Sequence, residues 1–268
     1  MNHFTDRIAV VTGAAGGIGR ATAIALARAG CHLALADVNR KGLEETAAAI
    51  RRLNRRASVH EVDVADEKRV EWWAGEVIRA HGAVHILINN AGISCGRSFA
   101  AMDAGDFDRV MAVNFRGTVY GCRYFLPHLK AAPEAHIVNL SSLFGILGVS
   151  GRSAYCASKF ALRGFSEALQ MELKRDGIGV TTVHPGAVNT GIAAAGPDAA
   201  SNQAMIKALN RGASPEQVAD QIVAAIRKND IRRVITRGAL VLDGLKRLAP
   251  EQTQRLLGRL AARFKPAV

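Results

Sequence analysis

Cysteine is scarce in this sequence, and its placement excludes two common uses of the residue. The four cysteines, Cys31, Cys95, Cys122 and Cys156, lie far apart and form no Cys-x-x-Cys pair. They therefore provide neither the ligand spacing of a zinc site nor the framework of a small disulfide-rich domain. We expect no metal site, and we interpret the cysteines as small buried residues of a protein in a reducing cytoplasm.

Long hydrophobic runs are also missing. No segment approaches the ~18 consecutive apolar residues that a membrane-spanning helix needs. The N-terminal residues show no basic lead followed by a cleavable apolar stretch, so we expect no signal peptide and a cytoplasmic protein. Hydrophobic residues make up 49% and charged residues 22% of the 268 positions, which is typical of a folded soluble chain. This length suits one large domain with a well-buried core.

The net charge of +12 is concentrated near the C-terminus. From Ile226 onward eleven basic residues are accompanied by three acids, an excess of eight positive charges. This segment lacks the motifs of a nucleic-acid module, so we expect no specific nucleic-acid partner. From Glu251 to Lys265 the leucines and arginines recur at helical spacing, which predicts a basic amphipathic helix. Such a helix can lie weakly on an anionic membrane, or it can pack on the protein itself or on a neighbouring subunit.

Short apolar segments alternate with segments of helical length. The predicted strands are Arg7–Thr12, His32–Asp37, Ala57–Val62, Val84–Asn89, Ala135–Ser141 and Ile178–His184, and the predicted helices are Gly17–Ala29, Lys41–Leu53, Glu67–Ala80, Asp106–Lys130 and Ser153–Arg175. This alternation predicts an α/β fold with a doubly wound parallel sheet of the Rossmann type. We expect residues 1–250 to form this single domain, with residues 191–214 as a substrate loop and residues 251–268 as a helical appendage.

A glycine-rich turn connects the first strand to the first helix. Thr12, Gly13, Gly17, Ile18 and Gly19 belong to this turn. Glycines allow the backbone to turn tightly beside a pyrophosphate, and the helix N-terminus supplies unpaired N–H groups. The spacing is Gly-x-x-x-Gly-x-Gly, which differs from both the Gly-x-Gly-x-x-Gly fingerprint and the P-loop. Similar turns also occur for packing, so the turn alone does not identify a cofactor site.

Asp37 ends the second strand, 18 residues after Gly19. A carboxylate at this position can accept both ribose hydroxyls of NAD and repel the 2′-phosphate of NADP. Ala15 and Gly16 place no basic side chain in the turn, which also favours NAD. NADP stays an alternative because Arg40 could turn towards a 2′-phosphate, and Asp37 could also simply end the strand.

Further candidate cofactor contacts follow the third, fourth and sixth strands, at the edge where parallel sheets bind ligands. These residues are Asp63, Val64, Asn90, Ala91, Gly92, Pro185, Gly186, Val188 and Thr190. Asp63 could meet an adenine amino group or cap a helix, and Thr190 could bind a carboxamide. Turn chemistry alone could explain the small residues of the Asn-Asn-Ala-Gly segment.

Tyr155 and Lys159 are four residues apart on a predicted helix and therefore share one face. The pKa of a free tyrosine is ~10, so a shift to neutrality requires roughly 4 kcal/mol. A lysine charge ~4 Å away supplies about that much at an effective dielectric constant of ~20. Ser142, which follows the fifth predicted strand, could hydrogen-bond a substrate oxygen. Asn114 lies inside a predicted helix, where asparagine is mildly unfavourable and requires another reason.

Taken together, these residues resemble the short-chain dehydrogenase/reductase family in order and spacing from Arg7 to about Thr190. The resemblance implies a catalytic tetrad of Asn114, Ser142, Tyr155 and Lys159. In that tetrad Tyr155 transfers the proton, Lys159 lowers its pKa and holds the nicotinamide ribose, Ser142 orients the substrate oxygen and Asn114 positions a water. Helices equivalent to Asp106–Lys130 and Ser153–Arg175 pair between subunits in this family, so a homodimer or homotetramer is expected.

The expected activity is hydride transfer between a nicotinamide cofactor and a secondary alcohol or ketone. The segment 143–154 should border the substrate and is largely apolar, which favours a lipophilic or small uncharged compound. A sugar-nucleotide epimerase or dehydratase can share the Tyr-x-x-x-Lys pattern but usually differs in glycine spacing. A non-catalytic cofactor-binding regulator is the other alternative, and such proteins typically lose the tyrosine or the lysine.

Overall fold

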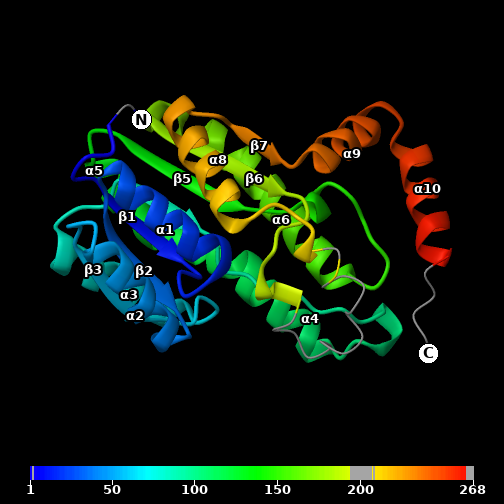
Figure 1. Cartoon of the computed structure of the whole chain (residues 1–268), viewed down its shortest axis with the longest axis horizontal. Helices are drawn as coiled ribbons and strands as arrows, with labels where there is room; N and C mark the ends of the chain where they lie inside the picture. Colours follow the sequence, from blue (N-terminus) through cyan, green and yellow to red (C-terminus); the bar gives the residue numbers. More distant parts are fainter. Residues whose placement is uncertain (2, 194–206, 208, 264–268) are drawn as a thin grey trace.

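A parallel sheet of seven strands organises the protein, in the order β3-β2-β1-β4-β5-β6-β7 (Figure 1). The strands are β1 Ile8–Thr12, β2 His32–Asp37, β3 Ala57–Glu61, β4 Ile86–Asn89, β5 Ala135–Leu140, β6 Ile178–Pro185 and β7 Arg232–Ile235. The computed structural model describes residues 1, 3–193, 207 and 209–263. Strand order reverses between β1 and β4, so a crevice opens at the carboxyl ends of these strands.

Helices cover both faces of the sheet and divide the core into two layers. One layer packs α1 (Gly17–Ala29), α2 (Arg40–Arg51) and α8 (Pro215–Lys228) on the sheet, and the other packs α3 (Glu67–His81), α5 (Gly117–Ala131) and α6 (Ser153–Leu173). Strands β1, β4 and β5 are buried along their whole length, as their continuous apolar sequences predicted. The predicted doubly wound α/β fold is confirmed.

Three parts of the fold differ from the sequence prediction. Strand β7 was not predicted, because two of its four residues are Arg232 and Arg233 and it lies at the edge of the sheet. The predicted single helix 106–130 is divided into α4 (Ala104–Met111), a π-helical turn (Ala112–Arg116) and α5. Helix α8 was also missed, although Ser214 and Gln217 form a capping box around Pro215.

The C-terminal region is helical, as predicted, and it begins earlier than residue 251. Helix α9 (Arg237–Leu248) follows β7, and α10 (Pro250–Arg263) packs on α9 at one end of the molecule (Figure 1). Residues 194–206 and 208 of the predicted substrate loop lie outside the described residues. In the described part of the chain, no helix combines the length and the apolar character needed to cross a membrane. All four cysteines are buried, as the sequence predicted.

Candidate active site

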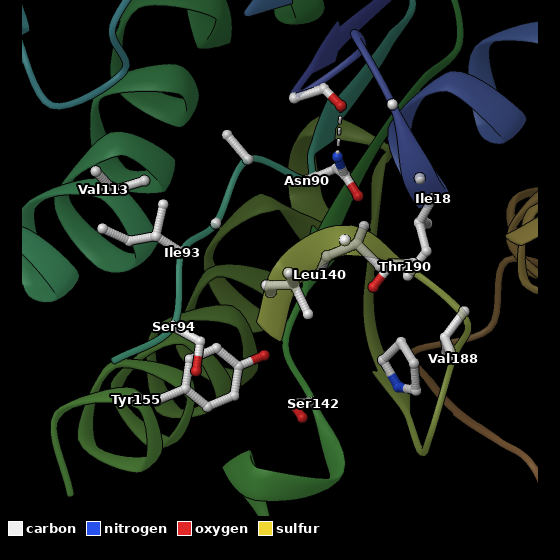
Figure 2. Close-up of a pocket in the computed structure, with 18 of the residues that line it drawn as sticks. Ile18, Asn90, Ile93, Ser94, Val113, Leu140, Ser142, Tyr155, Val188 and Thr190 are labelled. Carbon is white, nitrogen blue, oxygen red and sulfur yellow. Dashed lines mark hydrogen bonds between the residues drawn. The ribbon is translucent and has the colours of Figure 1, made fainter. Parts of the chain in front are cut away.

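A cavity of about 820 Å³ opens at the carboxyl ends of the central strands. Most of the predicted site residues line it: Gly13, Gly17, Ile18, Asp37, Asp63, Val64, Asn90, Ala91, Gly92, Ser142, Tyr155, Lys159, Pro185, Gly186, Val188 and Thr190. Thr12, Gly19 and Asn114 are not part of its wall. Figure 2 shows Ile18, Asn90 and Thr190 towards one end of the cavity and Tyr155 and Ser142 towards the other.

The glycine turn forms the first end of the cavity. Gly13 and Gly17 have positive φ angles of 66° and 50°, which explains why residues without a side chain occur there. A Cβ at Gly19 would collide with the carbonyl oxygen of Gly13, so Gly19 lets α1 begin close against the turn. Helix α1 has no acid in its first turn, and its N-cap Gly16 provides no side-chain cap. The N-terminal N–H groups of α1 are therefore suited to an anionic group such as a pyrophosphate.

Thr12 and Asn90 connect the glycine turn to the loop after β4. The Thr12 hydroxyl accepts hydrogen bonds from the backbone N–H groups of Asn90 (2.9 Å) and Ala91 (3.0 Å). The Asn90 amide nitrogen donates to the carbonyl oxygens of Thr12 (2.9 Å) and Gly13 (3.2 Å). Thr12 thus shapes the cavity without lining it, and Asn90 does both.

Asp37 lies at the carboxyl end of β2, half-buried in the cavity wall. Its two carboxylate oxygens accept hydrogen bonds from the N–H groups of Ala15 and Asn39, each at 3.0 Å. Each oxygen can accept further hydrogen bonds, so the carboxylate fits a ribose diol. Arg40 is exposed in the first turn of α2 and does not line the cavity.

Asp63 also lines the cavity, where its side chain already has two partners. Its Oδ1 accepts from the N–H of Ala65 at 3.0 Å, and its Oδ2 accepts from Arg109 of α4 at 2.8 Å. The Arg109 guanidinium, which also lines the cavity, was not predicted from the sequence. Nothing local marks it, because α4 brings it to Asp63 from 46 residues away.

Tyr155 and Lys159 project from α6, one helical turn apart. The Lys159 ammonium lies 5.7 Å from the centre of the Tyr155 ring and donates a 2.7 Å hydrogen bond to the carbonyl oxygen of Leu140. Lys159 is almost fully buried, and this burial lowers its pKa from 10.5 to about 8. A buried ammonium has little contact with water, so it gains strongly from hydrogen bonds to hydroxyl groups that enter the cavity.

The pKa of Tyr155 is raised in the structure, whereas the sequence led us to expect that Lys159 lowers it. Burial raises it, while the hydrogen bond of Ser142 and the charge of Arg152 act in the opposite direction. Burial dominates the pKa of Tyr155 here, and the Lys159 ammonium donates its hydrogen bond to the Leu140 carbonyl. The phenol is therefore protonated at neutral pH in this structure, as a proton donor must be.

Ser142 follows β5 and caps a short 3₁₀ turn, its hydroxyl accepting from the N–H of Phe144 at 3.1 Å. Behind it lies His184 of β6, whose Nδ1 is 3.0 Å from the Ser142 carbonyl oxygen. Burial lowers the pKa of His184 to about 4, so the ring is neutral and its Nδ1–H can donate to that carbonyl. Ser141 donates to the carbonyl oxygen of Lys159 at 2.9 Å and ties β5 to α6. Sequence reasoning missed both His184 and Ser141.

Asn114 occupies the π-helical turn between α4 and α5 and is fully buried. Its amide nitrogen donates to the Ile93 carbonyl oxygen and to the Ser158 hydroxyl, both at 3.0 Å, and its Oδ1 accepts from the Ile93 N–H at 2.8 Å. The reason for an asparagine inside this helix is therefore the π-turn, which directs the amide at the loop after β4. π-turns of this kind are frequent at functional sites.

The end of the cavity beside Tyr155 is largely apolar. Its wall includes Ile93, Val113, Leu140, Leu143, Phe144 and Ile192. The Phe144 ring meets the Tyr155 ring edge to face at 6.2 Å. Besides Lys159, the charged Arg152 is buried in this wall and donates to the Ser94 hydroxyl at 2.9 Å.

Comparison with known proteins agrees with this geometry. A family model described as short chain dehydrogenase matches residues 7–200. SadH of Mycobacterium tuberculosis, named as an oxidoreductase, is 39% identical over 273 residues that cover 99% of each chain. Cyclohexanol dehydrogenase of an Acinetobacter species is 30% identical over 244 residues, 91% of this chain and 96% of that enzyme. A solved short chain dehydrogenase/reductase from Burkholderia phymatum in complex with NAD is 29% identical, with a TM-score of 0.88 over 100% of this chain and 99% of that one.

Proposed function

Because the chain belongs to the short-chain dehydrogenase/reductase family of oxidoreductases, we propose that it interconverts a secondary alcohol and a ketone with NAD as the hydride carrier. One observation carries the proposal. The Tyr155 and Ser142 hydroxyls lie together at the apolar end of a cavity whose other end is an open helix N-terminus. This arrangement provides a proton donor and a place for a carbonyl oxygen beside a dinucleotide-sized site.

The residues of the chain handle the oxygen and its proton. In ketone reduction, Ser142 donates a hydrogen bond to the carbonyl oxygen, and Tyr155 transfers its phenolic proton to that oxygen as the carbon is reduced. In alcohol oxidation, the Tyr155 phenolate takes the hydroxyl proton. The Lys159 ammonium favours the phenolate electrostatically and can bind a ribose hydroxyl. NAD, when bound, supplies or accepts the hydride.

NAD fits the cavity through residues with distinct tasks. The N–H groups at the start of α1 suit the pyrophosphate, and Asp37 suits the adenosine ribose. Asp63 and Val64 are placed to border the adenine, and Ala91 and Gly92 would run beneath the cofactor. A Cβ at Gly92 would lie 3.3 Å from Asn114 Oδ1 and in ordinary contact, at 3.5 Å, with the Lys159 ammonium, so glycine leaves more room beside both side chains. Pro185, Gly186, Val188 and Thr190 also line the cavity and would border the nicotinamide half of the cofactor.

The substrate we propose is a lipophilic or small uncharged alcohol or ketone. The wall beside Tyr155 is mainly aliphatic and aromatic, and the buried Arg152 already has the Ser94 hydroxyl as a partner. The test is a screen of cyclic and linear secondary alcohols with NAD and with NADP. Formation of the reduced cofactor is measured by its absorbance at 340 nm. Turnover of cyclic or branched alcohols with NAD supports the proposal, and failure of every alcohol and ketone with both cofactors contradicts it.

Cofactor preference tests the role of Asp37. We expect kcat/KM of the parent protein to be higher with NAD than with NADP. Asp37→Ala should raise KM for NAD about 10-fold, because hydrogen bonds to a charged acceptor contribute about 1.5–3 kcal/mol. The same change should improve the relative use of NADP, since it removes repulsion of the 2′-phosphate. Arg40→Ala is the control, and a parent protein that prefers NADP would show that Arg40 or a neighbour recognises the phosphate.

We also propose that copies of the chain assemble through α5 and α6. On α6, Met171 is 74% exposed and Phe160 is 41% exposed, so this helix presents two large apolar side chains to a partner. Light scattering at micromolar concentration should therefore give a mass two or four times 28.5 kDa. Met171→Asp should reduce that mass. A monomeric parent protein would contradict the assembly and leave the catalytic proposal intact.

A further inference from the structure

Helix α9 is oriented with its apolar residues outward. Leu240, Val241, Leu245 and Leu248 are 54%, 61%, 44% and 87% exposed. At 100° per residue they fall within an arc of about 140° on one side of the helix. We call these four residues the α9 apolar face. The opposite side of α9 buries Ala239 and the only acid of the helix, Asp243.

Buried polar contacts fix this orientation. The Asp243 carboxylate accepts two hydrogen bonds from the Arg232 guanidinium of β7, at 2.9 and 2.7 Å, and one from Arg247 at 3.4 Å. These partners lower the pKa of Asp243, so it stays charged and paired. Thr236, which begins α9, has φ of +88° and accepts at its hydroxyl from the Ala239 N–H at 3.3 Å. Rotating the leucines inward would break this bidentate pair, which costs several kcal/mol when the acid is buried.

Basic side chains outnumber acidic ones on α9 and α10, and on α9 Arg237 lies in line with the apolar face at the start of the helix while Arg247 lies beside it. Between residues 237 and 259 the basic residues are Arg237, Lys246, Arg247, Arg255 and Arg259, and the acids are Asp243 and Glu251. Both acids are already paired, Asp243 with Arg232 and Glu251 with Arg255 at 3.4 Å. An apolar face with a positive margin is complementary to the apolar interior and anionic headgroups of a lipid bilayer.

A second copy of the chain fits this surface less well. A symmetric contact would place the basic margins of the two copies against each other, because the same patch meets itself across a two-fold axis. The acids that could compensate are engaged within their own chain. Charge complementarity therefore favours an anionic surface as the occupant.

Helix α10 links α9 to the loop beside the cavity. Lys246 of α9 donates to the Gln254 side chain at 3.3 Å, and Gln254 donates to the carbonyl oxygen of Gly148 at 3.0 Å. Gly148 lies in the loop that continues from Leu143 and Phe144, which line the cavity. Leu256 of α10 adds a further side chain that is 51% exposed. The α9–α10 pair projects beyond the sheet at this end of the molecule (Figure 1).

We propose that the α9 apolar face docks the protein on anionic lipid bilayers, with the basic margin at the headgroups. Each basic residue near such a surface contributes about 1 kcal/mol, and salt screens this attraction. Binding should therefore be reversible and sensitive to ionic strength. The proposal is independent of the catalytic function and moves the predicted membrane contact from residues 251–268 to α9.

Vesicle flotation of the full chain tests the proposal. The parent protein should float with phosphatidylcholine vesicles that contain phosphatidylglycerol, at low salt, and much less with phosphatidylcholine alone. Leu245→Ser/Leu248→Ser should weaken this binding about 10-fold or more, since two leucines no longer enter the apolar layer. Ile231→Ser is the matched control: Ile231 is 67% exposed at the other end of β7, and its loss should leave binding unchanged.

A reporter at the tip of the face adds a second measurement. Leu248→Trp should show a blue shift on adding anionic vesicles and quenching by brominated acyl chains, while Ile231→Trp should show neither. The parent protein, with Trp72 and Trp73, provides the background. Absence of flotation at low salt overturns the proposal, as does equal binding of the leucine and isoleucine variants. A leucine variant that loses oligomer mass instead would assign the face to contact between copies.

Discussion

Tyr155→Phe is expected to lower kcat by about 1,000-fold while leaving NAD affinity within a factor of about two. The change removes only the phenolic hydroxyl, and positioned proton transfer contributes about 10²–10⁴-fold to enzymatic rates. The Phe144 ring packs against the edge of Tyr155, and a phenylalanine preserves that contact. Steady-state kinetics with the best alcohol from the screen and fluorescence titration of NADH measure the two quantities.

Ser142→Ala is the companion variant, because it removes the second hydroxyl at the same end of the cavity. It should lower kcat less than Tyr155→Phe, since it removes a hydrogen bond and not the proton donor. The pH profile adds a further check. Burial raises the pKa of Tyr155, so alcohol oxidation, which requires the phenolate, should accelerate as the pH rises. Substantial turnover by Tyr155→Phe would rule out the proposed mechanism.

Lys159→Met is expected to lower activity strongly and to stabilise the fold. Loss of the ammonium removes the charge that favours the phenolate and a hydrogen bond to the ribose, so kcat should fall about 100-fold and NAD should bind about 10-fold more weakly. The stability effect follows from burial. The pKa of Lys159 is about 8 in the folded protein and ordinarily 10.5, so the unfolded chain holds this proton more tightly.

The sign of this effect depends on pH. Below about pH 8 the lysine is charged in both states, and burying the charge costs about 3 kcal/mol of unfolding free energy by linkage. Above about pH 8 the folded protein releases the proton, and the cost disappears as the pH approaches 10.5. Methionine has no charge to bury, so the variant gains this free energy of unfolding. It also leaves the Leu140 carbonyl without its hydrogen-bond partner, and that loss reduces the gain by about 1–3 kcal/mol.

Urea unfolding at pH 7 and pH 10 measures this difference. Lys159→Met should be at least as stable as the parent at pH 7, and its advantage over the parent should shrink at pH 10. Tyr155→Phe serves as the control, because its effect on stability should change little between pH 7 and pH 10. If Lys159→Met is less stable than the parent, and the deficit is larger at pH 7 than at pH 10, the buried ammonium stabilises the fold and the prediction is wrong.

Local sequence patterns were sufficient for most of the sheet. Strands buried on both faces are continuous apolar runs, and β1, β4 and β5 were found for this reason. Strand β7 was missed because it lies at the edge of the sheet. An edge strand is less buried, so it tolerates Arg232 and Arg233 and does not form a continuous apolar run. The π-turn at Asn114 was not predicted, because the hydrogen bonds that accompany it join Asn114 to Ile93 and Ser158, which are distant in the chain.

The sequence by itself determined the α/β fold, the glycine turn at the start of α1 and the shared helical face of Tyr155 and Lys159. Each depends on interactions between residues close in the chain, where spacing translates directly into geometry. Only the tertiary structure decided the partner of Asp63, the buried position of Lys159 against Leu140 and the outward leucines of α9. These depend on which distant segments meet, and helical periodicity shows that a helix has two faces without showing which one is buried.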